Sequence, residues 1–382
     1  MVQLGDIVRA VRDVYLKVRR TTPFQRKALW AIERCRTAVM KAVRVKCEEC
    51  GDEYLLYRSC RNRHCPRCQV AVRERWLAAR ERELLPVPYF HVVFTVPEIL
   101  NEIALYCPEV FYAALLSAAG NALLDVGMSK LHARLGVLTI LHTWGQNLML
   151  HPHAHCVVPG GGFSQDGKRW IGVRKPTYLL PVKVLMARFR TLLCNALRQA
   201  AKEGKLHRLP KNALPYAAIE GAAAQEWIVY AKPPFGGPRQ VLEYLSRYTH
   251  RVAISNRRIL SFANGKVTFV WRDYADGNRV KVSTIDVMEF MRRFLMHVLP
   301  DRFVRIRYYG FLANGRRHEN IELARELIGR SEPLRFRQRP RFRALCPACM
   351  AKSMRAYKRR RAQRRNPYRP PPVRADAVGV VL

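Results

Sequence analysis

Residues 148–162 read LMLHPHAHCVVPGGG and place three histidines within five residues, beside an apolar run with the pattern of a strand. Side chains two residues apart on a strand project from the same face, about 6.5–7 Å apart along the chain. His153 and His155 therefore point together and can hold one divalent ion between them. His151 has the same parity, but Pro152 indicates that the strand only begins there. We therefore expect His151 to lie outside the metal site.

The neighbouring stretch HTWGQNL is the expected source of a third metal ligand. If it pairs antiparallel with HAHCVV through a tight turn, Gln146 lies opposite His153, whereas a change of register by one residue would remove this pairing. Gln146 is therefore the predicted third ligand, and the alternatives are His142 and His91. Cys156 points to the opposite face and has no partner thiol in the stretch, which argues against a redox site.

The whole chain of 382 residues is strongly basic, with a formal net charge of +39 and 49% hydrophobic residues. It is long enough for two folded domains. A small domain needs a net charge of only about 2–8 in magnitude for solubility, so the excess indicates a polyanionic partner such as DNA, RNA or a membrane surface. No apolar run approaches the roughly 18 residues of a membrane span, and the N-terminus lacks a signal-peptide core. We therefore expect nucleic acid as the partner and no membrane.

Four of the eleven cysteines follow the pattern C-x2-C-x14-C-x2-C, which is typical of tetrahedral zinc. They are Cys47, Cys50, Cys65 and Cys68. Cys60 and His64 lie close enough in sequence to replace one of them, so the exact four ligands stay open. Paired cysteines of this kind are typical of metal sites in a reducing compartment. We expect a cytoplasmic protein that is associated with the nucleoid when it is on DNA.

Arginines flank the predicted zinc site and make it a candidate contact for the DNA backbone. They are Arg58, Arg61, Arg63 and Arg67. A further cysteine pair, Cys346 and Cys349 in LCPACM, is only half of a zinc site, so zinc there would need partners elsewhere in the chain.

Strands and helices alternate along the chain, which predicts an α+β fold. YFHVVFTVP is a β-branched and aromatic run bounded by prolines, typical of a buried strand. A hairpin with an Asn264–Gly265 turn follows later in the chain. We expect four parts: an N-terminal helical and zinc-binding module at residues 1–85, the main sheet domain at 86–260, an α/β extension at 261–332 and a basic tail at 333–382.

Residues 241–256, VLEYLSRYTHRVAISN, carry two tyrosines on one face of an expected helix. Tyr244 and Tyr248 are one turn, about 6 Å, apart. Tyrosine is a recognised covalent nucleophile, but its ordinary pKa near 10 means that it needs help to attack a phosphate. Arg247 and Arg251 supply positive potential beside the tyrosines and are candidate DNA contacts. Taken alone, two tyrosines on an amphipathic helix are more often core residues.

Together, the histidine strand, the tyrosine helix about ninety residues later, the zinc motif and the positive charge resemble the HUH endonucleases. Within that group, the chain resembles the two-tyrosine rolling-circle transposases of the insertion-sequence-ninety-one group. The resemblance spans residues 47–314 and rests on the segments SCRNRHCPRCQ, YFHVVFTVP, HTWGQNLMLHPHAHCVVPGGG, YLSRYTHRVAISN and HVLPDRFVRIRYYGFLAN. It implies an HUH-type antiparallel sheet with flanking helices, joined to an N-terminal zinc-ribbon module.

The resemblance also implies the site residues and the chemistry. The metal ligands would be His153, His155 and Gln146, and the nucleophiles Tyr244 and Tyr248. An enzyme of this kind cleaves and joins single-stranded DNA with Mg²⁺ or Mn²⁺, through a 5′-phosphotyrosine and a free 3′-OH. Zn²⁺ would be structural, and no nucleotide cofactor is expected because no Walker-type loop is present. Two alternatives stay open: a plasmid relaxase or replication initiator of the HUH type, and a zinc-ribbon nucleic-acid-binding protein without catalysis.

Overall fold

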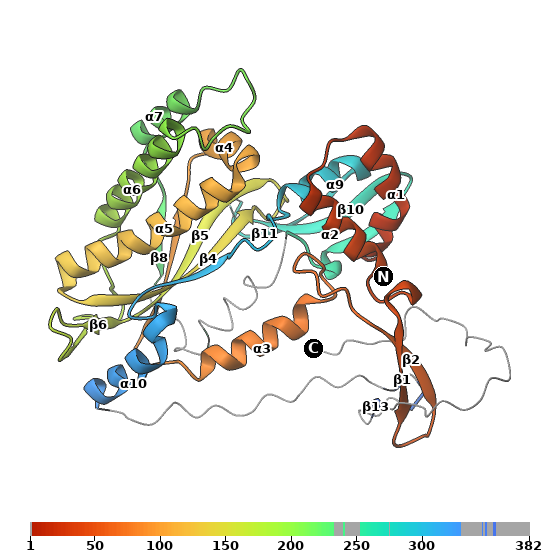
Figure 1. The fold of residues 1–382 in the computed structure, drawn as a ribbon, viewed down its shortest axis with the longest axis horizontal. Coiled ribbons are helices and arrows are strands. Elements are labelled where there is room, and N and C mark those ends of the chain that lie inside the picture. Colours follow the sequence, from red (N-terminus) through yellow and green to blue (C-terminus); the bar gives the residue numbers. More distant parts are fainter. Residues whose placement is uncertain are drawn as a thin grey trace.

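The computed structural model describes residues 2–232, 240, 253–274, 276–329, 346, 348–349 and 354–356. In these residues the largest sheet has seven strands in the order β7-β6-β4-β5-β3-β8, with β12 also paired to β4 (Figure 1). All of its pairings are antiparallel. The strands are β3 (Tyr89–Thr95), β4 (Arg134–Trp144), β5 (Leu150–Pro159), β6 (Gly161–Phe163), β7 (Trp170–Gly172), β8 (Val229–Lys232) and β12 (Ile306–Gly310). The predicted α+β class with an antiparallel sheet is confirmed.

Side-chain parity separates the two faces of this sheet. Val137 of β4 and Cys156 of β5 are buried on one face, in the largest hydrophobic core. Leu138 and Val157, one residue further along each strand, point to the other face and pack with Leu77 of α3. The first face is covered by α4 (Asn101–Tyr106), α5 (Pro108–Val126), α6 (Val182–Lys202) and α7 (Pro215–Ala224) (Figure 1). On the other side lie α3 (Gln69–Glu81) and α10 (Arg317–Ile328).

The long helix α5 is the centre of the first face. Together with the π turn after it, the segment Pro108–Leu131 is long and apolar enough to cross a membrane by length and composition. In this fold 61% of its apolar window is buried, and Phe111, Leu115 and Leu123 are completely covered. The helix is apolar because it packs between the sheet and α6, as the core helix of an α+β unit does.

A second core joins the N-terminal helices to a smaller sheet from the other half of the chain (Figure 1). Ile7, Leu29 and Phe290 are fully buried there. Asp286 begins α9 as its N-cap, with a carboxylate that accepts a hydrogen bond of 2.8 Å from the Met288 amide. The elements of this core are α1 (Leu4–Val18), α2 (Pro23–Arg34), β9 (Ile259–Ala263), β10 (Lys266–Asp273), β11 (Arg279–Asp286) and α9 (Val287–Met296).

The predicted hairpin turn is confirmed between β9 and β10. Asn264 and Gly265 have φ values of 51° and 69°, and Ala263 pairs with Lys266 across the turn. Positive φ at both central residues is the requirement of a type I′ turn, which Asn-Gly meets at low cost.

A third, small sheet has the order β13-β1-β2 and is antiparallel. Its strands are β1 (Ala42–Cys47), β2 (Glu53–Tyr57) and β13 (Met354–Ala356). In Figure 1 the β1–β2 hairpin projects away from both larger cores. Among the residues whose side chains the structure describes, none of β1 or β2 belongs to a hydrophobic core cluster.

Contacts in the structure cross the expected domain boundaries. The helices at residues 4–34, expected in the N-terminal module, share a core with residues 253–298. Strand β12, expected in the α/β extension, adds to the large sheet beside β4. The amphipathic faces of α1 and α2 pack on α9 and on the sheet of β9, β10 and β11.

Candidate metal centres

Three histidines converge on the α3 side of the large sheet. His153 and His155 come from β5, and His142 comes from β4, where the register pairs it directly with His153. One ring nitrogen from each histidine lies within 4.8 Å of the other two. The rings of His142 and His155 have their centroids 4.3 Å apart. We name these three residues the histidine cluster. Three imidazoles at this spacing are the donor set of a single divalent metal ion.

Hydrogen bonds on the far side of the rings orient two of these histidines. Nδ1 of His153 lies 2.6 Å from the carbonyl oxygen of His151, to which it donates. Nδ1 of His155 lies 2.7 Å from Nε2 of His91 on β3. When each Nδ1 carries the proton, the Nε2 atoms of both residues are left as lone-pair donors. This is the usual support of a metal-binding histidine.

Burial keeps the site uncharged before any metal binds. Desolvation lowers the pKa of His153 to about 4 and the pKa of His91 to about 4. The pKa of His155 is lowered still further, first by burial and then by its histidine neighbours. The imidazoles of His91, His153 and His155 are therefore neutral near pH 7, which is the protonation state that ligates a metal.

The predicted pair His153 and His155 is thus brought together, whereas the predicted third ligand, Gln146, lies outside the cluster. Gln146 does not lie opposite His153; it lies in the turn after β4, and its Nε2 donates to the Tyr274 hydroxyl at 3.3 Å. His142, only an alternative in the sequence, occupies the facing position. The reason is a wider turn and an irregularity in the β4–β5 ladder after His142, which sequence spacing does not reveal.

The two residues on either side of the cluster also have defined roles. His151 stays outside the cluster, as expected, and contributes its carbonyl oxygen. His91, the other alternative ligand, supports His155 instead of joining the metal-binding set.

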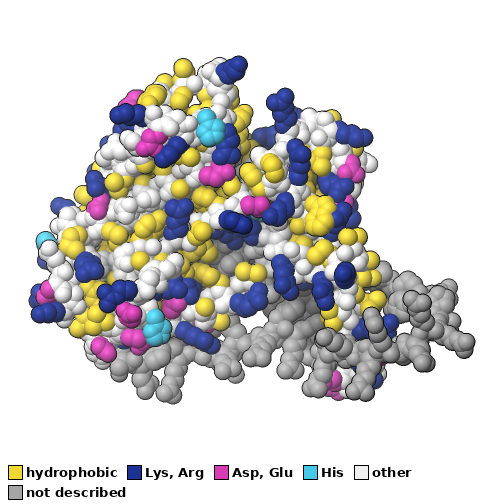
Figure 2. All heavy atoms as spheres, viewed as in Figure 1, with side chains coloured by type: hydrophobic (Ala, Val, Ile, Leu, Met, Phe, Trp, Pro, Cys, Tyr) yellow, Lys and Arg dark blue, Asp and Glu magenta, His cyan; other side chains and the backbone are white. Residues whose placement is uncertain are grey.

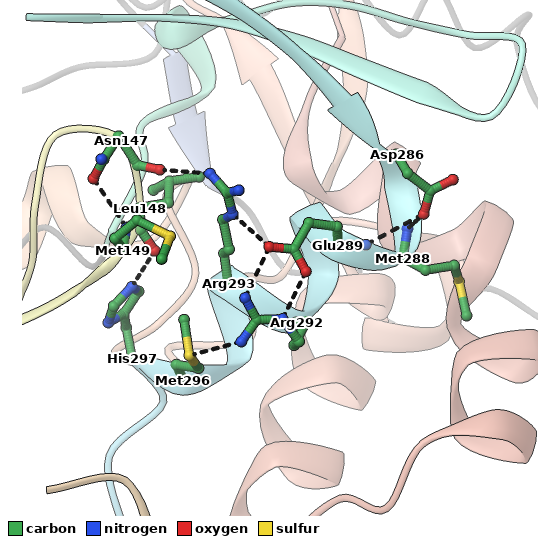
Figure 3. Close-up of polar contacts among 10 residues, drawn as sticks. All are labelled: Asn147, Leu148, Met149, Asp286, Met288, Glu289, Arg292, Arg293, Met296 and His297. Atoms are coloured by element: carbon green, nitrogen blue, oxygen red, sulfur yellow. Dashed lines mark hydrogen bonds and ion pairs between the residues drawn. The ribbon is translucent and has the colours of Figure 1, made fainter. Parts of the chain in front are cut away.

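The turn between the two histidine strands is held by α9 (Figure 3). His297 Nε2 lies 3.0 Å from the carbonyl oxygen of Leu148, and Arg293 Nη1 donates to the Asn147 carbonyl at 3.3 Å. Glu289 accepts hydrogen bonds from Arg292 and Arg293, which lower its pKa to about 2 and fix the arginines in place. The second core therefore sets the position of the turn that aligns β4 with β5.

Four thiols form a cluster at the edge of the second core, and we name it the core cluster. It consists of Cys35, Cys60, Cys65 and Cys68. The Sγ atoms of Cys35 and Cys60 each lie 3.5 Å from that of Cys68. Hydrogen bonds from the neighbouring thiols, that of Cys35 above all, hold the pKa of Cys68 far below its usual range. Four thiols that lie this close together are the donor set of a tetrahedral zinc ion.

Four further thiols converge on the β1–β2 hairpin, and we name them the hairpin cluster. It consists of Cys47, Cys50, Cys346 and Cys349. The structure therefore places the two C-x2-C pairs of the predicted single site in different clusters. Each pair is only half of a tetrahedral site, and sequence spacing does not say which halves combine. Cys60 joins a cluster, whereas His64 accepts a hydrogen bond of 3.0 Å from the Leu299 amide and stays outside both.

The arginines of the zinc region differ in their surroundings. Arg61 is exposed, as expected of a DNA contact. Arg63 is instead engaged inside the protein, where it donates to the carbonyl oxygens of Pro300 and Phe303, each at 2.5 Å. Arg67 donates to the Cys35 carbonyl at 3.5 Å. Figure 2 shows Lys and Arg side chains spread over the visible face of the molecule, both on the part built on the large sheet and on the part around the second core.

The predicted nucleophiles and their flanking arginines, which are Tyr244, Tyr248, Arg247 and Arg251, lie outside the described residues.

Replacing His91 by alanine should weaken Mn²⁺ binding about 10–100-fold, because His155 would lose the partner that fixes its ring. Titration calorimetry of the purified chain with Mn²⁺ measures the effect, and His91→Gln should recover part of the affinity because its amide oxygen can still accept from Nδ1. The exposed His207 provides the matched control, as His207→Ala should bind Mn²⁺ normally. Equal affinity for wild type and His91→Ala would contradict the supporting role.

In a comparison with known proteins, the chain matches two family models and two relatives. The model described as "Putative transposase" matches residues 136–320, and "Transposase zinc-binding domain" matches residues 7–96. The chain is 46% identical to "Putative transposase y4qJ" of Sinorhizobium fredii, over 87% of this chain and 85% of the relative. It is 26% identical to the "Transposase for insertion sequence element IS801" of Pseudomonas savastanoi pv. phaseolicola, over 73% of this chain and 68% of the relative.

Among solved structures, the chain is similar to the conjugative relaxase TrwC in complex with oriT DNA. The TM-score is 0.22 at 13% sequence identity, and the match covers 42% of this chain and 71% of TrwC.

Proposed function

The chain belongs to the IS91 family of transposases, and on this premise we propose that it cuts and rejoins single-stranded DNA through a covalent tyrosine–DNA intermediate. The observation that carries the proposal is the histidine cluster, three imidazoles from two paired strands. A site of this kind activates a phosphodiester. The net charge of +39 supports DNA as the substrate, because phosphate contacts dominate nucleic-acid affinity. The cytoplasm is the proposed location.

The residues of the histidine cluster fit a divalent metal ion, with Nε2 of His153 and His155 and a nitrogen of His142 as its ligands. When bound, Mg²⁺ or Mn²⁺ supplies Lewis-acid polarisation of the scissile phosphate and stabilises charge on the leaving oxygen. Imidazole ligands suit Mn²⁺ better than Mg²⁺, which prefers oxygen. His91 and the His151 carbonyl keep the rings oriented while the substrate exchanges.

The nucleophiles in this proposal are Tyr244 and Tyr248. One hydroxyl attacks the phosphate, which forms a 5′-phosphotyrosine and releases a 3′-OH on the other DNA end. The phosphodiester energy is kept in the tyrosine ester, so rejoining to a second 3′-OH needs no ATP. Two tyrosines on one helix face allow one to hold the element end while the other cuts the target.

Substituting both Tyr244 and Tyr248 by phenylalanine should abolish the covalent adduct while single-stranded DNA binding survives. The adduct is measured by denaturing gel electrophoresis after incubation with Mn²⁺ and labelled single strands from the element ends. Each single substitution should leave some adduct, because the other tyrosine can still attack.

The exposed Tyr178 offers a matched control, since Tyr178→Phe should form the adduct at the wild-type level. An adduct that persists in the double variant would show that the nucleophile lies elsewhere. If wild type forms no adduct on any strand tested, the chain is a zinc-containing DNA-binding protein without this chemistry. An adduct formed only on a plasmid origin strand would favour the relaxase or initiator role.

A further inference from the structure

We propose that the hairpin cluster binds a second structural zinc ion, which ties the arginine-rich C-terminal region to the β1–β2 hairpin. The family model for zinc binding ends at residue 96, so it contains only half of this cluster. The other half, Cys346 and Cys349, lies about 300 residues further along the chain. The ion would therefore join two segments that lie about 300 residues apart in the sequence.

The distances between the thiols fit a tetrahedral ion. The Sγ atoms of Cys47 and Cys349 are 3.6 Å apart, and those of Cys50 and Cys346 are also 3.6 Å apart. A zinc ion with Zn–S bonds of about 2.3 Å separates its sulfur ligands by roughly 3.8 Å. A disulfide would need about 2.05 Å. The four sulfurs thus surround a common point at the separation that zinc requires, without being bonded in pairs.

The backbone around Cys47 and Cys50 has the form of a tight metal-binding turn. The Gly51 amide donates to the Cys47 carbonyl at 3.1 Å, and the Cys47 amide donates to the Asp52 carbonyl at 2.9 Å. Gly51 has a φ of 77°, which a side chain would oppose. The turn brings both thiols to one end of the hairpin.

Strand pairing brings the distant cysteine pair to the same place. Strand β13 pairs antiparallel with β1, with Cys47 opposite Met354. Cys346 and Cys349 precede this strand in the sequence, so the pairing and the thiol contacts are two independent links between the same segments.

The β1–β2 hairpin needs such an ion, because its described side chains form no hydrophobic core of their own. Among the described side chains of β1 and β2, Val45 and Cys47 are the buried hydrophobic residues, and neither belongs to a core cluster. An isolated hairpin is marginally stable in water. Modules too small to bury a core are usually held by metals or disulfides. Here thiols at metal-binding separation supply the missing stabilisation.

The ion also has a consequence for DNA binding, because the sequence on both sides of Cys346 is rich in arginine. Residues 335–343 alternate arginine with other residues in RFRQRPRFR, and residues 358–365 read KRRRAQRR. An ion at the hairpin cluster would attach this basic region, through Cys346 and Cys349, to the β1–β2 hairpin. This consequence rests on the proposed function, because only then is single-stranded DNA the partner of these arginines.

The test is to count zinc in the full-length protein and in paired cysteine variants by elemental mass spectrometry after dialysis. Cys346→Ser with Cys349→Ser should lose one zinc ion per chain relative to wild type. Cys47→Ser with Cys50→Ser should also lose one. The combination of all four substitutions should again lose one, because both pairs serve the same ion. Any zinc bound by the histidine cluster is present in wild type and variants alike, so it does not affect the difference in zinc content between them.

Matched controls separate this site from loss of fold. Cys60→Ser with Cys65→Ser removes ligands of the core cluster and should lose a different zinc ion, so adding Cys346→Ser and Cys349→Ser should bring the loss to two. Cys194 lies in neither cluster, and Cys194→Ala should keep the wild-type zinc content. The tetrahedral thiolate absorption of the Co²⁺-substituted protein should fall in parallel with the zinc count. Unchanged zinc in the variant without Cys346 and Cys349, or a loss of two ions in the fourfold hairpin variant, would overturn the proposal.

A second measurement addresses the basic region. The variant with Cys346→Ser and Cys349→Ser should bind a fluorescent oligo-dT strand more weakly than wild type. The slope of log affinity against log salt should become shallower, by about 0.7 for each phosphate that the protein no longer neutralises. The zinc count needs no DNA, so it stands even if the cleavage assay fails. A lower zinc count with unchanged affinity and slope would overturn the link between the ion and DNA.

Discussion

His142→Ala should reduce metal-dependent cleavage of single-stranded DNA at least ~100-fold, whereas Gln146→Ala should leave most of the activity. His142 faces His153 across the β4–β5 ladder, and its ring nitrogen lies within 4.8 Å of those of His153 and His155. Removing one of the three ligands leaves the metal with two protein ligands and lowers its affinity. It also weakens the charge stabilisation that the metal gives to the transition state, which contributes several kcal/mol. The Gln146 side chain instead contacts Tyr274, outside the cluster.

Two measurements are needed for this comparison. Adduct formation at a series of Mn²⁺ concentrations shows whether excess metal rescues His142→Ala, which is expected in part when affinity is the main loss. Circular dichroism verifies that β4 still folds. If Gln146→Ala were as inactive as His142→Ala, the glutamine would be a ligand in the DNA-bound state. If His142→Ala were fully active, the three-histidine assignment would be wrong.

Loss of the core cluster should have the largest effect on stability. Cys65→Ser, or zinc removal by a strong chelator, should lower the melting temperature by at least ~10 °C. Structural zinc binds with an apparent ~10–16 kcal/mol, which is similar to the whole stability of a domain, ~5–15 kcal/mol. Each kcal/mol shifts the midpoint by roughly 2–4 °C in a domain of this size. Cys65 and Cys68 are buried in the second core, so their loss also removes packing there.

Hydrogen exchange should locate that damage. Amides of α1, α2 and α9 should lose protection, because they share the second core, while amides of β3 in the large sheet should keep it. Cys194→Ala, at a buried thiol of the large sheet unit, is the matched control and should lower the melting temperature much less. Uniform loss of protection over both units would mean that the core cluster supports the entire chain rather than the second core.

What the sequence could predict was local. The parity of a strand places His153 and His155 on one face and Cys156 on the other, and the structure has this arrangement. The Asn264–Gly265 turn follows from the φ values that such a turn requires. Each depends on residues that are neighbours in the chain, so pattern and propensity were sufficient.

What it could not predict depends on distant partners. Whether His142 or Gln146 faces His153 is decided by the turn after β4, whose shape is held by His297 and Arg293 from the second core. Likewise, a C-x2-C pair has the same local sequence whichever second pair completes its site. The sequence therefore could not predict how the cysteines divide between two clusters. Cys35 gave no signal, because it is not part of a C-x2-C pair.

The second core also constrains how the protein is made. Its residues Ile32 and Ala253 pack in one cluster but leave the ribosome far apart in time. At about 5–20 residues per second, the interval is on the order of 10–40 s. During this interval α1 and α2 expose their apolar faces and need protection from aggregation. The residues that hold the β4–β5 turn, Arg293 and His297, are synthesised later still. A growing polypeptide therefore contains the histidine strands before it contains the support that aligns them.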